Sequence, residues 1–354
     1  MKVGLLTFHD TSNFGSLLQT YGLYKKVNDL GYECEVIDYQ CENIVKREVP
    51  DSFHFTLSPH ALLHDFFVLR HQRLKYKALS HFMHSKIVLS DRCDRDTISI
   101  VSNQYETLLI GSDIVWGLDI TDGDLTYLLD FAEYRKCRKL SYAASIGNPW
   151  TEDEKIMVAP LLKRFNHISV RENESAEWVK DASGCEASVV CDPTMLLTPD
   201  EWKNEVDVEI GRNKKYILVY FMKGDCLKSA LEYSKKTRLD VFVVGYGVSR
   251  SRDYRFVQPH SLCDFLSLVY NATIVFTASY HGFLFSTYFN RPFVYFNISH
   301  PSRMTTIARI LGVEHLDATH QVPKEIEYDY EMVNNKLEEY RQQSITELKR
   351  MLES

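Results

Sequence analysis

Short apolar runs alternate with amphipathic segments from the start of the chain. Residues 2–8 form an apolar run, a polar loop follows, and Leu23, Val27 and Leu30 then fall on one stripe of a predicted helix. Residues 33–39 alternate between apolar and polar positions, as a second strand does. This order of strand, helix and strand predicts a βαβ unit of the doubly wound type.

The same alternation continues along the chain and restarts once. Further strands are predicted at residues 106–110, 139–144, 166–170 and 187–191. After the turn residues Asp192 and Pro193 the pattern begins again, with strands predicted at residues 216–221, 241–245, 273–276 and 293–296. The restart predicts an α/β protein with two lobes, the first at residues 1–192 and the second at residues 193–327.

Residues 328–354 differ from the rest of the chain because they are strongly charged. Val333, Leu337 and Tyr340 form a narrow apolar stripe at helical spacing. This pattern predicts a helix that lies on the outside of the protein. By analogy with other two-lobed proteins, we expect this helix to pack back on the first lobe.

Composition narrows the class of protein. With 354 residues, 45% of them hydrophobic, the chain can bury a large core without metals or disulfides. Lys and Arg number 41 against 48 Asp and Glu, and the formal net charge of -7 indicates no nucleic-acid partner. The 8 cysteines include no CxxC pair, which favours a reducing compartment. Without a signal-peptide pattern or an apolar run of about 18 residues, we expect a soluble cytoplasmic protein.

Polar loops follow several predicted strands, where open α/β sheets carry their functional residues. In the first loop, Asn13, Gly15 and Ser16 stand before a predicted helix. Backbone N–H groups and the helix dipole favour an anion at such a position. Because many strand-to-helix turns contain the same residue types, an ordinary turn is the alternative interpretation.

The second loop follows the strand predicted at residues 106–110 and contains Gly111, Ser112, Asp113 and Trp116. Asp113 is suited to accept a sugar hydroxyl, and Trp116 offers an apolar face of the kind that stacks on a pyranose ring. A buried tryptophan beside a capping aspartate explains the same residues equally well.

The third loop places Arg171 at the end of the strand predicted at residues 166–170. A guanidinium at that position can hold a phosphate or carboxylate through two parallel hydrogen bonds. A structural salt bridge to Glu172 or Glu174 is the alternative.

The fourth loop, residues 277–282, carries His281 between a predicted strand and an apolar helix. A histidine near the positive end of a helix tends to stay neutral, which suits proton exchange near pH 7. The N–H groups of Gly282 and the residues after it can hold a phosphate. A purely structural histidine is the alternative.

Six segments in chain order together resemble the polysaccharide pyruvyl transferase family: NFGSLLQTY, GSDIVW, SYAASIG, ISVRE, CDPTMLL and TASYHG. They extend from residue 13 to residue 282. The resemblance implies two Rossmann-like lobes of glycosyltransferase B architecture with the active site in a central cleft. It also implies a reaction in which phosphoenolpyruvate gives its pyruvyl group to a sugar of an exopolysaccharide or cell-surface glycan, forming a ketal and releasing phosphate.

The resemblance also assigns residues to roles. The family's histidine falls on His281, its serine on Ser279 and its arginine on Arg171. His281 is then the expected proton carrier, and the residues expected to bind the donor are Arg171, Ser279, Gly282, Arg303, Asn13, Gly15 and Ser16. The residues expected on the acceptor side of the cleft are Gln19, Ser112, Asp113, Trp116, Ser145 and Tyr280. Four departures from the family pattern bear mainly on the acceptor: Ala278, Tyr280, Ile114 and Gly117.

Two other functions stay open on the sequence, a nucleotide-sugar glycosyltransferase with the same two lobes and a non-catalytic carbohydrate-binding partner. We expect no cofactor and no metal. Residues 122–124 read Asp-Gly-Asp, as in a metal motif of another glycosyltransferase fold, but a turn explains them. His60 and His64 stand four residues apart in a histidine-rich stretch that lacks further ligands at the right spacing.

Residues 60–80 combine Phe66 and Phe67 with the basic residues Arg70, Arg73 and Lys77. Such a helix either packs on the core through one face or rests on a membrane surface. A lipid-linked acceptor would favour the second interpretation, which would place the protein at the inner face of the membrane.

Overall fold

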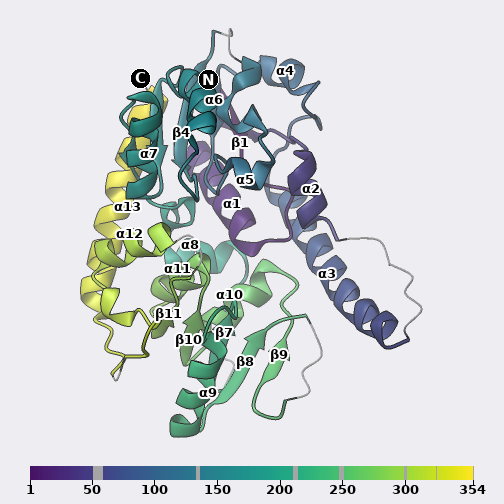
Figure 1. The fold of residues 1–354 in the computed structure, drawn as a ribbon, viewed down its shortest axis with the longest axis vertical. Coiled ribbons are helices and arrows are strands. Elements are labelled where there is room, and N and C mark those ends of the chain that lie inside the picture. The colour runs from purple at the N-terminus through teal and green to yellow at the C-terminus, as the bar shows by residue number, and fades with distance from the viewer. Residues whose placement is uncertain are drawn as a thin grey trace. The chain divides into compact units, whose positions relative to one another are not determined.

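The computed structural model describes residues 1–50, 59–132, 136–209, 214–246, 251–298, 301–323 and 325–353, with the backbone alone at residues 59–65. The chain divides into two compact units. The first unit contains residues 1–49, 80–197 and 338–354, and the second contains residues 50–79 and 198–337. Each unit is built around its own parallel sheet (Figure 1).

The sheet of the first unit has the strand order β2-β1-β3-β4-β5-β6, with every pairing parallel. Its strands are β1 (Lys2–Leu6), β2 (Glu33–Val36), β3 (Thr107–Ile110), β4 (Arg138–Ala144), β5 (His167–Val170) and β6 (Ser188–Val189). Because β1 pairs with β2 on one side and β3 on the other, the strand order reverses at β1, which is where ligands bind in open α/β sheets.

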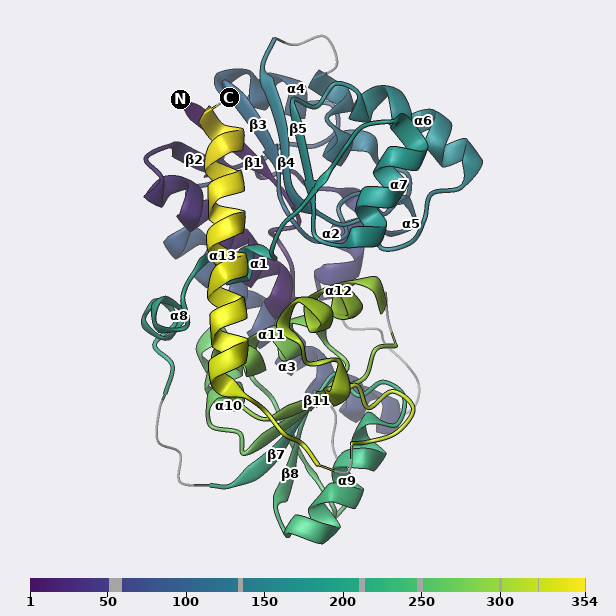
Figure 2. The ribbon, with the colours of Figure 1, turned by 90° about the vertical axis from the view of Figure 1, so that its left-hand side faces the viewer.

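Helices connect and flank these strands. They are α1 (Phe14–Asp29), α2 (Glu42–Glu48), α4 (Ile98–Val101), α5 (Leu118–Thr121), α6 (Glu152–Leu162) and α7 (Asn173–Ser183), with short 3-10 turns at η1 (Ser102–Gln104), η2 (Leu125–Leu128), η3 (Asp130–Ala132) and η4 (Pro193–Leu196). Figure 2 shows α6 and α7 side by side along one side of the sheet. Strand residues such as Leu5 and Leu109 are fully buried between the helical layers.

The second unit repeats the plan with the strand order β11-β10-β7-β8-β9, again all parallel. Its elements are α8 (Pro199–Glu205), β7 (Tyr216–Tyr220), α9 (Cys226–Thr237), β8 (Asp240–Val244), β9 (Arg255–Val257), α10 (Leu262–Tyr270), β10 (Ile274–Thr277), α11 (Tyr280–Tyr288), β11 (Phe293–Tyr295), α12 (Pro301–Leu311) and η5 (Glu314–Leu316). Helix α10 begins with a capping box, in which Ser261 is the N-cap and Asp264 the third helical residue.

These two sheets confirm the predicted α/β class with two Rossmann-like sets of strands. The predicted strands all occur, although β6 is shorter than residues 187–191 and β9 was not predicted. Strand β7 ends one residue early because Phe221 has a φ of 66°, far from the extended conformation of a regular strand.

The boundaries between the units differ from those expected. Residues 50–79, expected in the first lobe, belong to the second unit. Within it, His71 of α3 (Pro59–Lys86) hydrogen-bonds His260 at 2.8 Å, and the ammonium of Lys75 lies 5.3 Å from the ring centre of Tyr246. The first unit also extends to residue 197, because η4 packs so closely on α1 that a Cβ on Gly22 would lie 2.5 Å from the carbonyl oxygen of Pro193.

The C-terminal helix α13 (Tyr330–Glu353) has its residues from 338 onward in the first unit. There Arg138 donates a hydrogen bond of 2.6 Å to the carbonyl oxygen of Leu352, and the backbone N–H of Cys191 donates one of 2.9 Å to Ser344. No helix in the described ranges is both long and apolar enough to cross a membrane.

Candidate functional site

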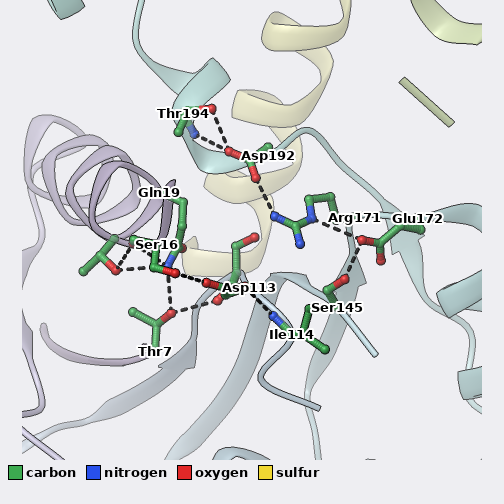
Figure 3. A network of polar contacts seen from close by, with 12 residues as sticks. Thr7, Ser16, Gln19, Asp113, Ile114, Ser145, Arg171, Glu172, Asp192 and Thr194 are labelled. Atoms are coloured by element: carbon green, nitrogen blue, oxygen red, sulfur yellow. Dashed lines mark hydrogen bonds and ion pairs between the residues drawn. The ribbon is translucent and has the colours of Figure 1, made fainter. Parts of the chain in front are cut away.

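A polar network lies at the carboxyl edge of the first sheet and joins the loops after β1 and β3 (Figure 3). The amide of Gln19 donates to the hydroxyl of Thr7 at 3.1 Å, and that hydroxyl donates to the carbonyl oxygen of Ser112 at 2.8 Å. Ser16 donates a short hydrogen bond to the carboxylate of Asp113. The structure therefore brings together two loops that the sequence singled out separately.

Asp113 is the residue of this network that combines partial exposure with an unusual backbone. Its φ of 81° lies in the left-handed region, which non-glycine residues seldom adopt outside turns and functional sites. One carboxylate oxygen accepts from Ser16 and the other accepts from the N–H of Ile114 at 2.8 Å. These contacts fix the orientation of the carboxylate.

Asn13 and Gly15 form the start of α1 beside this network. The side chain of Asn13 caps the helix by accepting a hydrogen bond of 2.9 Å from the N–H of Gly15. Asn13 is exposed, whereas Gly15 and Ser16 are buried. Gln19 and Ser112, which were expected on the acceptor side of the cleft, are completely buried.

Arg171 does not have the exposure that a donor-binding role requires. Its side chain is 1% exposed and forms ion pairs with Glu172 at 3.2 Å and with Asp192 at 2.7 Å. Figure 3 shows the guanidinium between the two carboxylates. This corrects the expected contact with the donor: the salt bridge to Glu172, which the sequence left open as the alternative, is the interaction present.

The two carboxylates around Arg171 are themselves held by neighbouring hydroxyls. Asp192 accepts from Thr194 at 2.7 Å, and Glu172 accepts from Ser175 at 2.8 Å. Ser145 donates a short hydrogen bond to Glu172 and is fully buried, so its expected position facing the acceptor is also corrected. The cluster holds together the ends of β4, β5 and the segment that follows β6.

Trp116 is likewise buried and cannot stack on a sugar in this structure. Its side chain is fully covered, and its indole N–H donates a hydrogen bond of 2.8 Å to the carbonyl oxygen of Tyr127. The alternative that the sequence left open, a buried tryptophan, is therefore confirmed. Its neighbour Trp150 donates in turn to the carbonyl oxygen of Trp116 at 2.9 Å.

The loop that carries His281 lies at the carboxyl edge of the second sheet. Ser279 is the N-cap of α11 and accepts a hydrogen bond of 3.3 Å from the N–H of Gly282. Thr277 donates to the carbonyl oxygen of Tyr220 at 2.9 Å, which ties the loop to β7. A Cβ on Gly282 would lie 2.3 Å from the hydroxyl of Thr277, so only glycine fits there.

Around His281 an aromatic ring and a cation come together. His281 is 9% exposed and meets the ring of Tyr280 edge-on, with centroids 5.5 Å apart. The guanidinium carbon of Arg303 lies 5.7 Å from the centroid of the same ring. Tyr280 therefore contacts both groups, and its burial corrects the acceptor role expected of it.

One residue at this edge was missed by the sequence analysis. Phe221 follows β7, has a φ of 66° and is 45% exposed. The ammonium of Lys223 lies 5.0 Å from the centre of its ring. Its position directly after an apolar strand is the signal that could have found it, since the other candidate loops were chosen in that way.

Residues 122–124 form the turn that the sequence favoured over a metal motif. Asp122 and Gly123 have φ values of 58° and 76°, and Asp124 caps η2 by accepting from the N–H of Thr126 at 2.9 Å. Among the described side chains, no three histidines, cysteines or acids form a group that could hold a metal ion. The side chains of His60 and His64 lie outside the described residues.

Comparison with known proteins agrees with the resemblance seen in the six segments. The model of the polysaccharide pyruvyl transferase family matches residues 13–300. No curated protein matches the chain by sequence.

Solved structures share the fold at low sequence identity. UDP-GlcNAc 2-epimerase from Neisseria meningitidis has 10% identity and a TM-score of 0.51, over 98% of this chain and 93% of that one. A structure of MnaA from S. aureus with UDP has 12% identity and a TM-score of 0.50, over 97% and 90%. These likenesses show the glycosyltransferase B-like fold alone. Because the family match spans most of its length, the chain belongs to the polysaccharide pyruvyl transferase family.

Proposed function

We propose that this protein transfers the pyruvyl group of phosphoenolpyruvate to two hydroxyls of a sugar, in the synthesis of an exopolysaccharide or cell-surface glycan. The observation that carries the proposal is the family match over residues 13–300, which includes the His281 loop. The guanidinium of Arg303 beside that loop supports it, because the donor carries both a phosphate and a carboxylate.

The reaction needs proton transfers but no external oxidant or water. A proton is added to the methylene carbon of the donor, one sugar hydroxyl attacks the adjacent carbon, and a second hydroxyl displaces phosphate. The two sugar hydroxyls lose one proton each. In the overall balance, one of these protons converts the methylene group to a methyl group, and the other is taken up by the released phosphate. A residue that exchanges protons near neutral pH is therefore required.

His281 is the proposed proton carrier. Imidazole side chains gain and lose a proton near pH 7, and His281 lies in the first turn of α11. The residue is largely buried, with an exposed fraction of 9%. The Arg303 guanidinium, held on the face of Tyr280, is placed to balance the donor's negative charge.

Backbone and hydroxyl donors complete the proposed donor site. Ser279 caps α11 and is half-buried, and the N–H groups of this helical turn attract a phosphate through the helix dipole. Gly282 lets the loop lie close to Thr277 and Tyr220. In the first unit, Asn13 is exposed, and a hydrogen bond from the N–H of Ile114 helps to fix the orientation of the Asp113 carboxylate.

The proposal is tested by incubating the purified chain with phosphoenolpyruvate and a panel of sugar glycosides. We expect phosphate release that depends on one glycoside, and a mass gain on that glycoside of one pyruvate less one water. Binding of a nucleotide sugar without any phosphate release would favour the glycosyltransferase alternative. No turnover and no nucleotide-sugar binding would favour a non-catalytic carbohydrate-binding partner.

The acceptor is proposed to be carried on a membrane lipid, and α3 is proposed to contact that membrane. Within the second unit, one face of α3 packs through His71 and Lys75. The same helix exposes Phe66 and Phe67, which are 48% and 42% exposed, together with Leu74. Residues 66–86 include no acidic side chain, while Arg70, Arg73 and Lys77 are exposed, so this part of α3 complements an anionic surface.

Vesicle sedimentation tests this contact. We expect the chain to bind phosphatidylglycerol vesicles at low salt more tightly than phosphatidylcholine vesicles, since the basic residues attract anionic lipid. Replacing Phe66, Phe67 and Leu74 with serine should weaken binding by about tenfold or more, because burying each side chain contributes about 1.5–3 kcal/mol. The control variant replaces Ile100 and Ile156, which are 70% and 73% exposed elsewhere. Equal binding of both variants, or none by the unaltered chain, would reject the contact.

A further inference from the structure

A cavity of about 410 Å³ opens in the first unit, apart from the residues assigned above. Its walls come from residues 39–46 after β2, from Asp94 and Arg95, and from residues 121–124. The segment at residues 39–43 follows the carboxyl end of β2, and the turn at residues 121–124 follows α5 in the connection from β3 to β4. One wall of the cavity therefore follows the carboxyl end of the edge strand β2, and the volume of the cavity suits a small molecule.

The floor of this cavity is held in place by hydrogen bonds. The hydroxyl of Tyr39 donates to Asp124 at 2.5 Å and accepts from Thr126 at 3.1 Å. Arg95 donates to Thr126 at 2.8 Å and forms an ion pair with Asp130. A site whose walls are fixed before binding loses little conformational entropy when a ligand arrives.

The polar groups on the walls suit a neutral polyol. Asn43, anchored by donating 2.8 Å to the carbonyl oxygen of Ile120, presents an amide. Asp122 is exposed in a left-handed turn and presents a carboxylate. Sugar hydroxyls donate and accept at the same time, so they pair with carboxylates and amides placed around one small space.

The charges on the walls argue against an anionic ligand. Four acidic side chains line the cavity, Glu42, Asp94, Asp122 and Asp124, against two basic ones, Lys46 and Arg95. Both basic groups are already in ion pairs, Lys46 with Glu42 and Arg95 with Asp130. A donor with several negative charges would be repelled here.

Covalent chemistry at the cavity is disfavoured as well. Cys41 contributes the thiol in its wall, and burial raises the pKa of that thiol to about 11. Burial and the hydrogen bond to Asp124 also raise the pKa of Tyr39. Both groups therefore stay protonated at neutral pH, and the cavity binds rather than reacts.

We propose that this cavity is the subsite for the acceptor glycan, holding a neutral pyranose through Asp122, Asn43 and Lys46. The inference rests on the proposed function for its biological meaning, since that reaction requires a sugar to bind together with the donor. It assigns the sugar to the first unit, whereas the proposed donor residues His281 and Arg303 belong to the second.

The test compares a cavity variant with a matched control. The cavity variant carries Asp122→Gly and Lys46→Ala, because glycine tolerates the φ of 58° at residue 122 and Lys46 is a 70% exposed side chain paired only on the surface. The control carries Asp207→Gly and Lys180→Ala. Asp207 is also exposed and has a positive φ, 51°, and Lys180 is also a surface lysine in an ion pair, 63% exposed. All four substituted side chains are exposed.

Binding is measured by calorimetry and saturation-transfer NMR with methyl glycosides of the common neutral hexoses and their N-acetylated forms. We expect one glycoside to bind the unaltered chain and the control equally, and to bind the cavity variant about tenfold or more weakly through lost hydrogen bonds. Phosphoenolpyruvate should bind all three chains with the same affinity. The inference is overturned if no glycoside binds, if the cavity variant binds like the control, or if that variant loses donor affinity.

The outcome separates this inference from the proposed reaction. Cavity-dependent sugar binding without turnover of phosphoenolpyruvate would retain the subsite and reject the reaction. Turnover with an unchanged KM for the sugar in the cavity variant would retain the reaction and reject the subsite.

Discussion

Replacing His281 with alanine should lower the rate of acceptor-dependent phosphate release from phosphoenolpyruvate by about 100-fold or more, the usual contribution of a positioned acid or base. The imidazole lies at the start of α11, and the guanidinium of Arg303 lies over the ring of Tyr280. Phosphate release at saturating donor and acceptor measures the effect.

The control for this prediction is His315→Ala, in the same unit. His315 is exposed and contacts the carbonyl oxygen of Glu327 at 3.0 Å, so its loss should leave turnover unchanged. The thermal midpoints of both variants should stay close to that of the unaltered chain. Near-normal turnover in the His281 variant would assign proton transfer to another residue.

Replacing Arg171 with alanine should destabilise the protein strongly instead of acting mainly on donor affinity. The change leaves Glu172 and Asp192 buried without their cation, and breaking a buried ion pair in this way costs about 3–5 kcal/mol. Denaturant unfolding measures the loss. The matched control, Arg350→Ala, removes a 55% exposed arginine paired with Glu347 and should have a much smaller effect.

A second variant separates structure from binding at this position. Arg171→Met combined with Glu172→Gln and Asp192→Asn removes all three charges at similar volume, and it should recover much of the lost stability. Donor affinity should then be close to normal. A stable Arg171→Ala protein that had lost only its affinity for phosphoenolpyruvate would show that the guanidinium reaches the donor after all.

The strands and helices were largely predictable because local sequence determines them. Apolar runs indicate the buried parallel strands, and turn residues such as Gly31 and Pro193 separate one element from the next. β9 was not predicted because residues 255–257 include an arginine and are only partly buried, so they do not form an apolar run. The predicted end of β7 was one residue too late, because the apolar pattern does not reveal the positive φ of Phe221.

The loops of the candidate site were found in the sequence for a similar reason. Parallel strands bring their carboxyl ends to one edge, so polar residues directly after apolar runs are the ones to inspect. That reasoning located Ser16, Asp113 and the His281 loop, which the structure places at sheet edges. It could not say which of these side chains would face a ligand.

The sequence by itself determined the α/β class, the restart that produces a second sheet, and the loops that hold polar groups. Tertiary structure decided that Arg171 and Trp116 are buried, that α3 contributes to the second unit, and that residues 39–46 and 121–124 enclose one cavity. The reason is physical. Periodicity and turn chemistry act over a few neighbouring residues, whereas burial and ion pairing depend on partners such as Asp192 that only the folded sheet brings within reach.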